Sequence, residues 1–127
     1  MPETATRAAT TAITWFEIPA ANLERAVRFY ETILEVPLQR IDFQGEPMAV
    51  FPYEQPGVGG CLVQSEHPSP HGTLVFINVD GRLDRTLELV ESAGGRIATP
   101  KVSLGPIGWA AHVIDSEGNR VGLHSKS

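Results

Sequence analysis

Asn22–Glu31, with the sequence NLERAVRFYE, is the segment that decides the fold, because the chain contains a second version of it. The second version is LDRTLELVE, residues 83–91, and it begins 60 residues after Leu23. In both segments the apolar residues recur at the three- and four-residue spacing of an amphipathic helix, so we predict helices near residues 22–34 and 82–93. The residues predicted to share one face are Leu23, Ala26, Val27, Tyr30 and Leu34 in the first helix, and Leu83, Thr86, Leu87 and Val90 in the second.

Each predicted helix has its own end signals. Asn22 can accept hydrogen bonds from the first free amides of the first helix, and Glu24 suits the positive end of the helix dipole. Asp80-Gly81 precedes the second helix. Gly94-Gly95 follows it, and glycine tolerates the left-handed conformation that is common at helix ends.

Runs of strand-forming residues flank the two helices in the same order. One run precedes each helix, at residues 12–18 and 73–79. Three short runs follow each helix, at 37–43, 47–51 and 60–64 in the first half and at 96–102, 109–114 and 120–124 in the second. The sequence therefore predicts an α+β fold of two tandem βαβββ modules, about 12–64 and 73–124, joined by a linker at 65–72.

Length and charge narrow the class of protein. The 127 residues suit a single domain, which we place at 12–127 after a disordered tail at 1–11. A net charge of −5 without a Lys/Arg cluster argues against nucleic-acid binding. No window approaches the roughly 18 apolar residues of a membrane span, and the tail lacks the apolar core of a secretory signal. The single cysteine, Cys61, fits a small buried strand residue in a reducing compartment, so we predict a cytoplasmic protein.

The two ends of this pattern resemble the vicinal oxygen chelate superfamily, which includes glyoxalase I, bleomycin-resistance proteins and extradiol dioxygenases. The resemblance is carried by WFEIPAANLERA at 15–26, which runs into Phe29-Tyr30, by Gly94-Gly95, and by DSEGNRVGL at 115–123. It covers residues 12–124 and implies that the modules form a cupped, glyoxalase-like open sheet around a small-molecule cavity. In the metal-dependent members this cavity holds a divalent ion, usually bound by His and Glu side chains.

The positions of those metal ligands carry other residue types in this chain. The side chains of Trp, Leu and Gly do not bind divalent metals. We therefore expect no metal and no cofactor, and neither metal-dependent glyoxalase nor extradiol dioxygenase activity. The resemblance places the ligand positions at Trp15 (or Thr14, if Ala20-Ala21 is an insertion), Leu62, Leu74 and Gly122.

Strand alternation predicts which side chains line the cavity, because every second residue of a strand faces the same side. If Trp15 faces the cavity, Glu17 faces it too, and a carboxylate among apolar side chains could act as a general acid or base. If the register is shifted by one residue, Glu17 instead pairs with an arginine outside the cavity. The glycine at 122 would leave room for substrate. The other predicted lining residues are Leu62, Gln64, Leu74, Phe76, Asn78, Gly122 and His124.

Several aromatic and histidine side chains have two interpretations. Trp109, after a Gly/Pro-rich loop, is either a ligand-binding wall of the cavity or a core anchor. His112 is either a cavity donor or a hydrogen-bonded strand residue, and His124 is either a cavity residue or a frayed end. His67 and His71 have the spacing of a helical metal site, but the two intervening prolines prevent a helix, so we assign them to the linker.

Three functions fit these observations. The first is a metal-independent lyase or isomerase with Glu17 as acid or base. The second is a protein that binds and sequesters a planar or hydrophobic compound. The third is an accessory dimer without a ligand. The fold alone does not separate them. We also expect a homodimer, because an open sheet has edges to cover, with each cavity formed either within one chain or between two.

Overall fold

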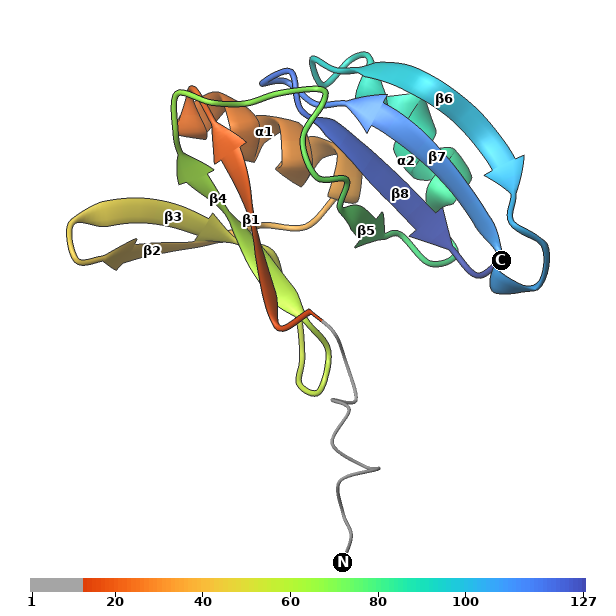
Figure 1. Ribbon diagram of the computed structural model, residues 1–127, viewed down its shortest axis with the longest axis horizontal. Helices are drawn as coiled ribbons and strands as arrows, with labels where there is room; N and C mark the ends of the chain where they lie inside the picture. Colours follow the sequence, from red (N-terminus) through yellow and green to blue (C-terminus); the bar gives the residue numbers. More distant parts are fainter. Residues whose placement is uncertain (1–12) are drawn as a thin grey trace, which may run out of the picture.

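The computed structural model describes residues 13–127 and has the predicted α+β architecture (Figure 1). Two βαβββ units follow one another in the chain, so the prediction of a repeated module is confirmed. The predicted tail at residues 1–11 lies outside the described residues. The elements are β1 (Trp15–Ala20), α1 (Leu23–Leu34), β2 (Gln39–Phe43), β3 (Glu46–Val50), β4 (Gly59–Gln64), β5 (Phe76–Asn78), α2 (Leu83–Val90), β6 (Arg96–Ser103), the short 3-10 helix η2 (Gly105–Ile107), β7 (Trp109–Ile114) and β8 (Arg120–Ser125).

Each module forms its own four-stranded sheet. The strand orders are β1-β4-β3-β2 and β5-β8-β7-β6, and in both sheets the first strand runs parallel to the last while the other pairs are antiparallel. β1 and β5 are thus edge strands that pair only within their own sheets, and they lie at the sides where the two sheets meet (Figure 1). We call the boundary between β1 and β5 the seam.

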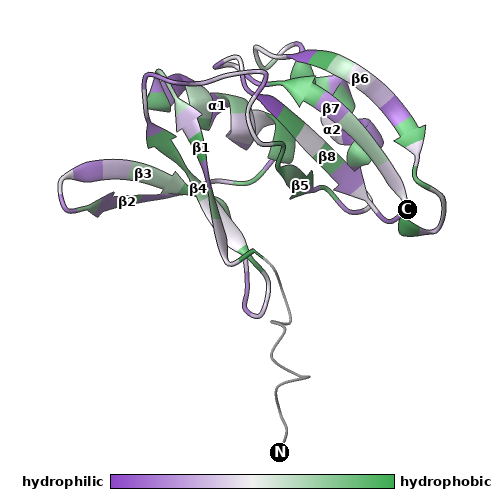
Figure 2. Cartoon of the chain, viewed as in Figure 1, coloured by the Kyte–Doolittle hydropathy of each residue, from purple (hydrophilic) through white to green (hydrophobic). Residues whose placement is uncertain are grey.

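The helices cover one face of both sheets and leave the other face open. α1 contacts β3 and β4, α2 contacts β6, β7 and β8, and the two helices contact each other. A shared hydrophobic core lies beneath them, with Ile18 and Leu62 under α1, and Ile77 and Leu123 under α2. The outer strand β6 carries both hydrophilic and hydrophobic residues and is exposed along most of its length (Figure 2). We call the sheet face away from the helices the open face.

The predicted N-terminal signal holds for α1 but not for α2. The Asn22 side chain accepts a hydrogen bond from the Arg25 amide at 3.0 Å, which confirms it as the N-cap of α1. The N-cap of α2 is Arg82, which makes no side-chain cap. Asp80 does not cap α2, because its carboxylate accepts a hydrogen bond from the Lys126 amide at 2.6 Å and so ties the C-terminal segment to the turn between β5 and α2.

The second helix ends at Val90, before the predicted end near residue 93. The Gly95 amide donates to the Val90 carbonyl at 3.0 Å, and Gly94 has a φ of +107°, a conformation that glycine adopts without strain. A Cβ atom at Gly95 would lie 2.4 Å from the Ile114 carbonyl oxygen of β7. The double glycine therefore lets the chain leave α2 and pass close to the sheet.

The DSEGN segment at 115–119 holds the two modules together. The buried Asp115 carboxylate accepts hydrogen bonds from the Tyr30 hydroxyl at 2.7 Å and from the Asn119 side chain at 3.1 Å. The Asn119 amide group also donates to the Pro19 carbonyl of β1 at 2.7 Å. The β7–β8 turn of the second module thereby contacts the first helix and the first strand. In this way the segment fixes one module relative to the other at the seam.

No helix among the described residues is long and apolar enough to cross a membrane.

Candidate functional site

Strand register determines which side chains occupy the open face. In the first module Trp15 and Glu17 of β1 share this face, and Glu17 pairs with Cys61 of β4. In the second module Phe76 of β5 pairs with Gly122 of β8, so both lie on the open face as well. The structure therefore places Trp15, Glu17, Phe76 and Gly122 on the same side of the molecule.

A pocket of 660 Å³ opens on this face at the seam. Its walls come from β1, from the segment that joins the modules, and from the beginning of β8. We call it the open-face pocket. Among the residues that line it are Trp15, Glu17, Pro19, Val58, His67, Leu74, Phe76 and Arg120.

Two aromatic rings beside the pocket lie directly against glycines of the sheets. A Cβ atom at Gly122 would lie 2.4 Å from the Phe76 ring, and one at Gly59 would lie 2.3 Å from the Tyr53 ring. Tyr53 packs edge-on against Trp15, with 5.8 Å between ring centroids. The prediction that Gly122 leaves room for substrate is wrong, since the Phe76 ring fills that space.

Glu17 points toward the open-face pocket but is exposed to solvent. Within residues 13–127 it forms no salt bridge and no side-chain hydrogen bond. Its charge acts on the buried Cys61 thiol: burial raises the pKa of Cys61, a hydrogen bond with Trp15 opposes this, and the Glu17 charge raises the pKa further. Cys61 is thus a protonated, buried strand residue rather than a nucleophile.

Arg120 is a charged residue of the pocket that the sequence analysis missed. Its Nη1 lies 3.2 Å from His112 Nδ1, and His112 packs edge-on against Phe76 at 5.7 Å between ring centroids. Because a guanidinium has only donors, His112 Nδ1 is the acceptor in this contact. Arg120 makes no salt bridge in the described part of the chain. Its two-residue spacing from Gly122 on β8 was the signal that could have identified it.

Several predicted lining residues lie elsewhere. Leu62 is fully buried beneath α1, and Gln64 accepts from the Leu23 amide at 3.1 Å, so both predictions are wrong: these side chains face the helix. His124 contacts the Ile107 carbonyl at 2.8 Å, and Trp109 lies under the Lys101 ammonium at 4.8 Å. Neither lines the open-face pocket, and Asn78 lines a different pocket on the helix side.

The comparisons with known proteins agree with this architecture. The sequence model of the Glyoxalase/Bleomycin resistance protein/Dioxygenase superfamily matches residues 12–123. The chain belongs to this superfamily. A glyoxylase-like domain-containing protein from Didymella fabae is 30% identical over 118 residues, covering 84% of this chain and 88% of that protein.

Solved structures of superfamily members share the fold. A glyoxalase/bleomycin resistance protein from Albidiferax ferrireducens T118 superposes with a TM-score of 0.71 at 13% identity, over 92% of this chain and all of that one. A glyoxalase-related enzyme from Fulvimarina pelagi superposes with a TM-score of 0.64 at 16% identity, over 89% of this chain and 86% of that one. At these identities the likeness concerns the fold and not the activity.

The side chains on the open face do not fit the divalent metal of the superfamily's metal-dependent members. Trp15, Leu74 and Gly122 offer no donor atom from their side chains. Across residues 13–127, no group of three or more His, Cys, Asp or Glu side chains is arranged to hold a metal ion.

Proposed function

We propose that this superfamily member binds a small, largely apolar organic compound in the open-face pocket. The observation that carries the proposal is the convergence of Trp15, Leu74 and Phe76 from both modules around a 660 Å³ space. Ligand pockets usually measure about 300–1,000 Å³ and combine apolar walls with a few polar groups. A space of this size suits a compound of one to three rings.

The charged groups suggest how such a ligand is oriented. Glu17 on β1 and Arg120 on β8 line the same pocket with opposite charges. Arg120 would bind an acceptor oxygen or an anionic group of the ligand, since its guanidinium is not neutralised by a carboxylate among residues 13–127. Glu17 would bind a donor group. The apolar walls supply most of the affinity in this arrangement.

Binding without turnover is favoured by the exposure of Glu17. A catalytic carboxylate acts most effectively when apolar neighbours exclude water, and in the single chain Glu17 is open to solvent. A second candidate is a metal-independent lyase or isomerase that uses Glu17 as acid or base. Its support is that the carboxylate lines the pocket where a substrate would lie.

Fluorescence titration with 1-anilinonaphthalene-8-sulfonate, an aromatic anion, tests the binding proposal. We expect saturable binding to the folded protein, about ten-fold weaker in Trp15→Ala because a buried aromatic contact is lost. Arg120→Gln should also weaken binding of the sulfonate. Trp109→Ala is the matched control, since Trp109 is 37% exposed against 39% for Trp15 and lines neither pocket.

The result that would overturn binding at this pocket is equal affinity in Trp15→Ala and Trp109→Ala. Glu17→Gln separates the two candidate functions. It should leave binding of the anionic probe intact or strengthen it, since it removes a negative charge. A reaction catalysed by the wild type and abolished by Glu17→Gln, with probe binding retained, would favour the enzyme.

A further inference from the structure

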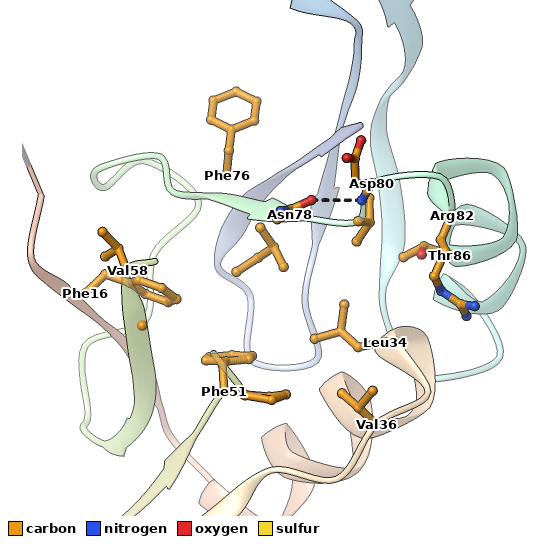
Figure 3. A pocket seen from close by; sticks show the side chains of 14 residues that line it. Phe16, Leu34, Val36, Phe51, Val58, Phe76, Asn78, Asp80, Arg82 and Thr86 are labelled. Carbon is orange, nitrogen blue, oxygen red and sulfur yellow. Dashed lines mark hydrogen bonds between the residues drawn. The ribbon is translucent and has the colours of Figure 1, made fainter. Parts of the chain in front are cut away.

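We propose that the seam carries a second ligand site on its helix side, which binds a small neutral, mostly apolar compound through the Thr86 hydroxyl. The site is a pocket of 480 Å³ that we call the helix-side pocket (Figure 3). It is separate in function from the open-face pocket. Its lining includes Phe16, Leu34, Val36, Phe51, Val58, Asn78, Val79, Asp80, Arg82 and Thr86.

The pocket exists because β1 and β5 do not pair across the seam. The end of α1 and the segment after β3 form one wall, with the apolar side chains of Leu34, Val36 and Phe51. β5 and α2 form the other wall (Figure 3). One wall is thus almost entirely apolar, and the polar groups of the pocket belong to the second module.

Thr86 is the feature that points to a ligand. The residue is fully buried in the first turn of α2, and its hydroxyl has no hydrogen-bond partner among the described residues. Buried hydroxyls are normally satisfied, because an unpaired one loses its hydrogen bonds to water without replacement. A valine at position 86 would fill the same volume without burying an unpaired hydroxyl. A hydroxyl beside an open pocket is satisfied when a bound molecule supplies an acceptor oxygen.

The remaining polar groups define a neutral ligand. Asn78 Oδ1 accepts from the Asp80 amide at 2.9 Å, which leaves the Asn78 Nδ2 donor available at the pocket wall. Arg82 forms a salt bridge with Glu35, so its charge is compensated. The Asp80 carboxylate disfavours an anion. Thr86 and Asn78 are thus the two uncharged donors in the lining of a pocket with apolar walls, and this arrangement suits an aromatic ketone, ester or ether.

The two pockets can be tested independently because their linings differ. Phe16, Val58 and Phe76 line both pockets and are unsuitable for the test. Thr86 and Val36 line only the helix-side pocket, whereas Trp15 and Arg120 line only the open-face pocket. The proposal does not rest on the function proposed for the open-face pocket, and either can fail alone.

Prodan, a neutral naphthyl ketone whose emission reports hydrogen bonding to its carbonyl, is the probe. We expect saturable binding of prodan to the wild type. Thr86→Val should weaken this binding about five-fold, which corresponds to the loss of one hydrogen bond. The emission of the bound dye should shift to the blue in Thr86→Val. Thr86→Ser keeps the hydroxyl and should keep the affinity. Thermal unfolding of Thr86→Val should occur at the same or a higher temperature.

Val36→Trp provides a second variant that does not disturb the core, since Val36 lies at the rim. The indole should fill the helix-side pocket and abolish the prodan binding that Thr86→Val weakens, whereas Val102→Trp, at an exposed valine on β6, should not. Trp15→Ala and Arg120→Gln should leave the affinity of this site for prodan unchanged. Absence of saturable binding, equal affinity in Thr86→Val, or loss of binding in Trp15→Ala would each overturn the proposal.

Discussion

The hydrogen bonds of two carboxylates at the β7–β8 turn, Asp115 and Glu117, explain the acidic residues of the DSEGN segment. Asp115 accepts four hydrogen bonds, from the Tyr30 hydroxyl, the Glu117 and Asn119 amides and the Asn119 side chain. A buried carboxylate is tolerated when its oxygens are satisfied in this way. Burial raises the pKa of Tyr30 well above its usual range, and the Asp115 charge raises it further, so Tyr30 stays a donor.

Glu117 is the second such carboxylate, and its effect on stability should depend on pH. Burial opposes its ionisation, but the Arg25 guanidinium at 2.6 Å, the Asn22 amide and the Ser116 hydroxyl together hold the pKa of Glu117 below its usual value of 4.5. A lowered folded-state pKa gives stabilisation that is complete above the unfolded-state pKa and is lost as the pH falls through the folded-state value.

Glu117→Gln should therefore lower the free energy of unfolding at pH 7 by about 2 kcal/mol, as expected for a charged hydrogen bond with a buried acceptor. The difference from wild type should shrink as the pH falls below 4.5. Urea denaturation across this pH range measures it. Glu24→Gln removes an exposed partner of Arg40 and should have little effect at any pH. A difference that does not vary with pH would contradict this account.

At the scale of elements, the sequence predicted the two helices but not which residues of β4 face the helix. Apolar spacing identified α1 and α2 to within a few residues, because one face of each is buried. On β4, residues Gly59 to Leu62 are all buried, so hydropathy does not alternate and cannot reveal which residues face the helix. The β1–β4 register shows that Leu62 faces the helix, because it pairs Leu62 with Ile18. The sequence prediction of Leu62 as a pocket residue failed for this reason.

The turn after α2 allows a test of how tightly the helix packs on its sheet. Gly95→Ala would place a Cβ atom 2.4 Å from the Ile114 carbonyl oxygen and 2.6 Å from the Phe29 ring. We expect it to lower the free energy of unfolding by about 2 kcal/mol, since backbone atoms cannot easily move aside. Gly72→Ala, where no atom lies within 4 Å, is the matched control for urea denaturation. Equal stability of the two variants would show that the turn tolerates displacement.

At the scale of the whole molecule, the open face carries exposed apolar side chains from both sheets. Five large apolar side chains are exposed on it, from both sheets: Trp15, Ile41, Phe43, Phe76 and Val102. Apolar groups gathered on one exposed face commonly mark an interaction surface. β2 is also an edge strand whose outer side is unpaired among the described residues. These features support the expectation of a homodimer that covers the open face.

A second copy would also close the open-face pocket, which lies on the same side of the molecule. A twofold arrangement brings the same surface of each chain together, so one substitution acts twice at the interface. Light scattering at micromolar concentration should therefore give twice the 13.8 kDa mass of one chain. Phe43→Glu, at a side chain that is 57% exposed on the open face, should shift the protein to the single-chain mass. Ile107→Glu adds the same charge at a residue that is 63% exposed in η2 and should leave the dimer intact. A single-chain mass for the wild type would mean that each open-face pocket works within one chain.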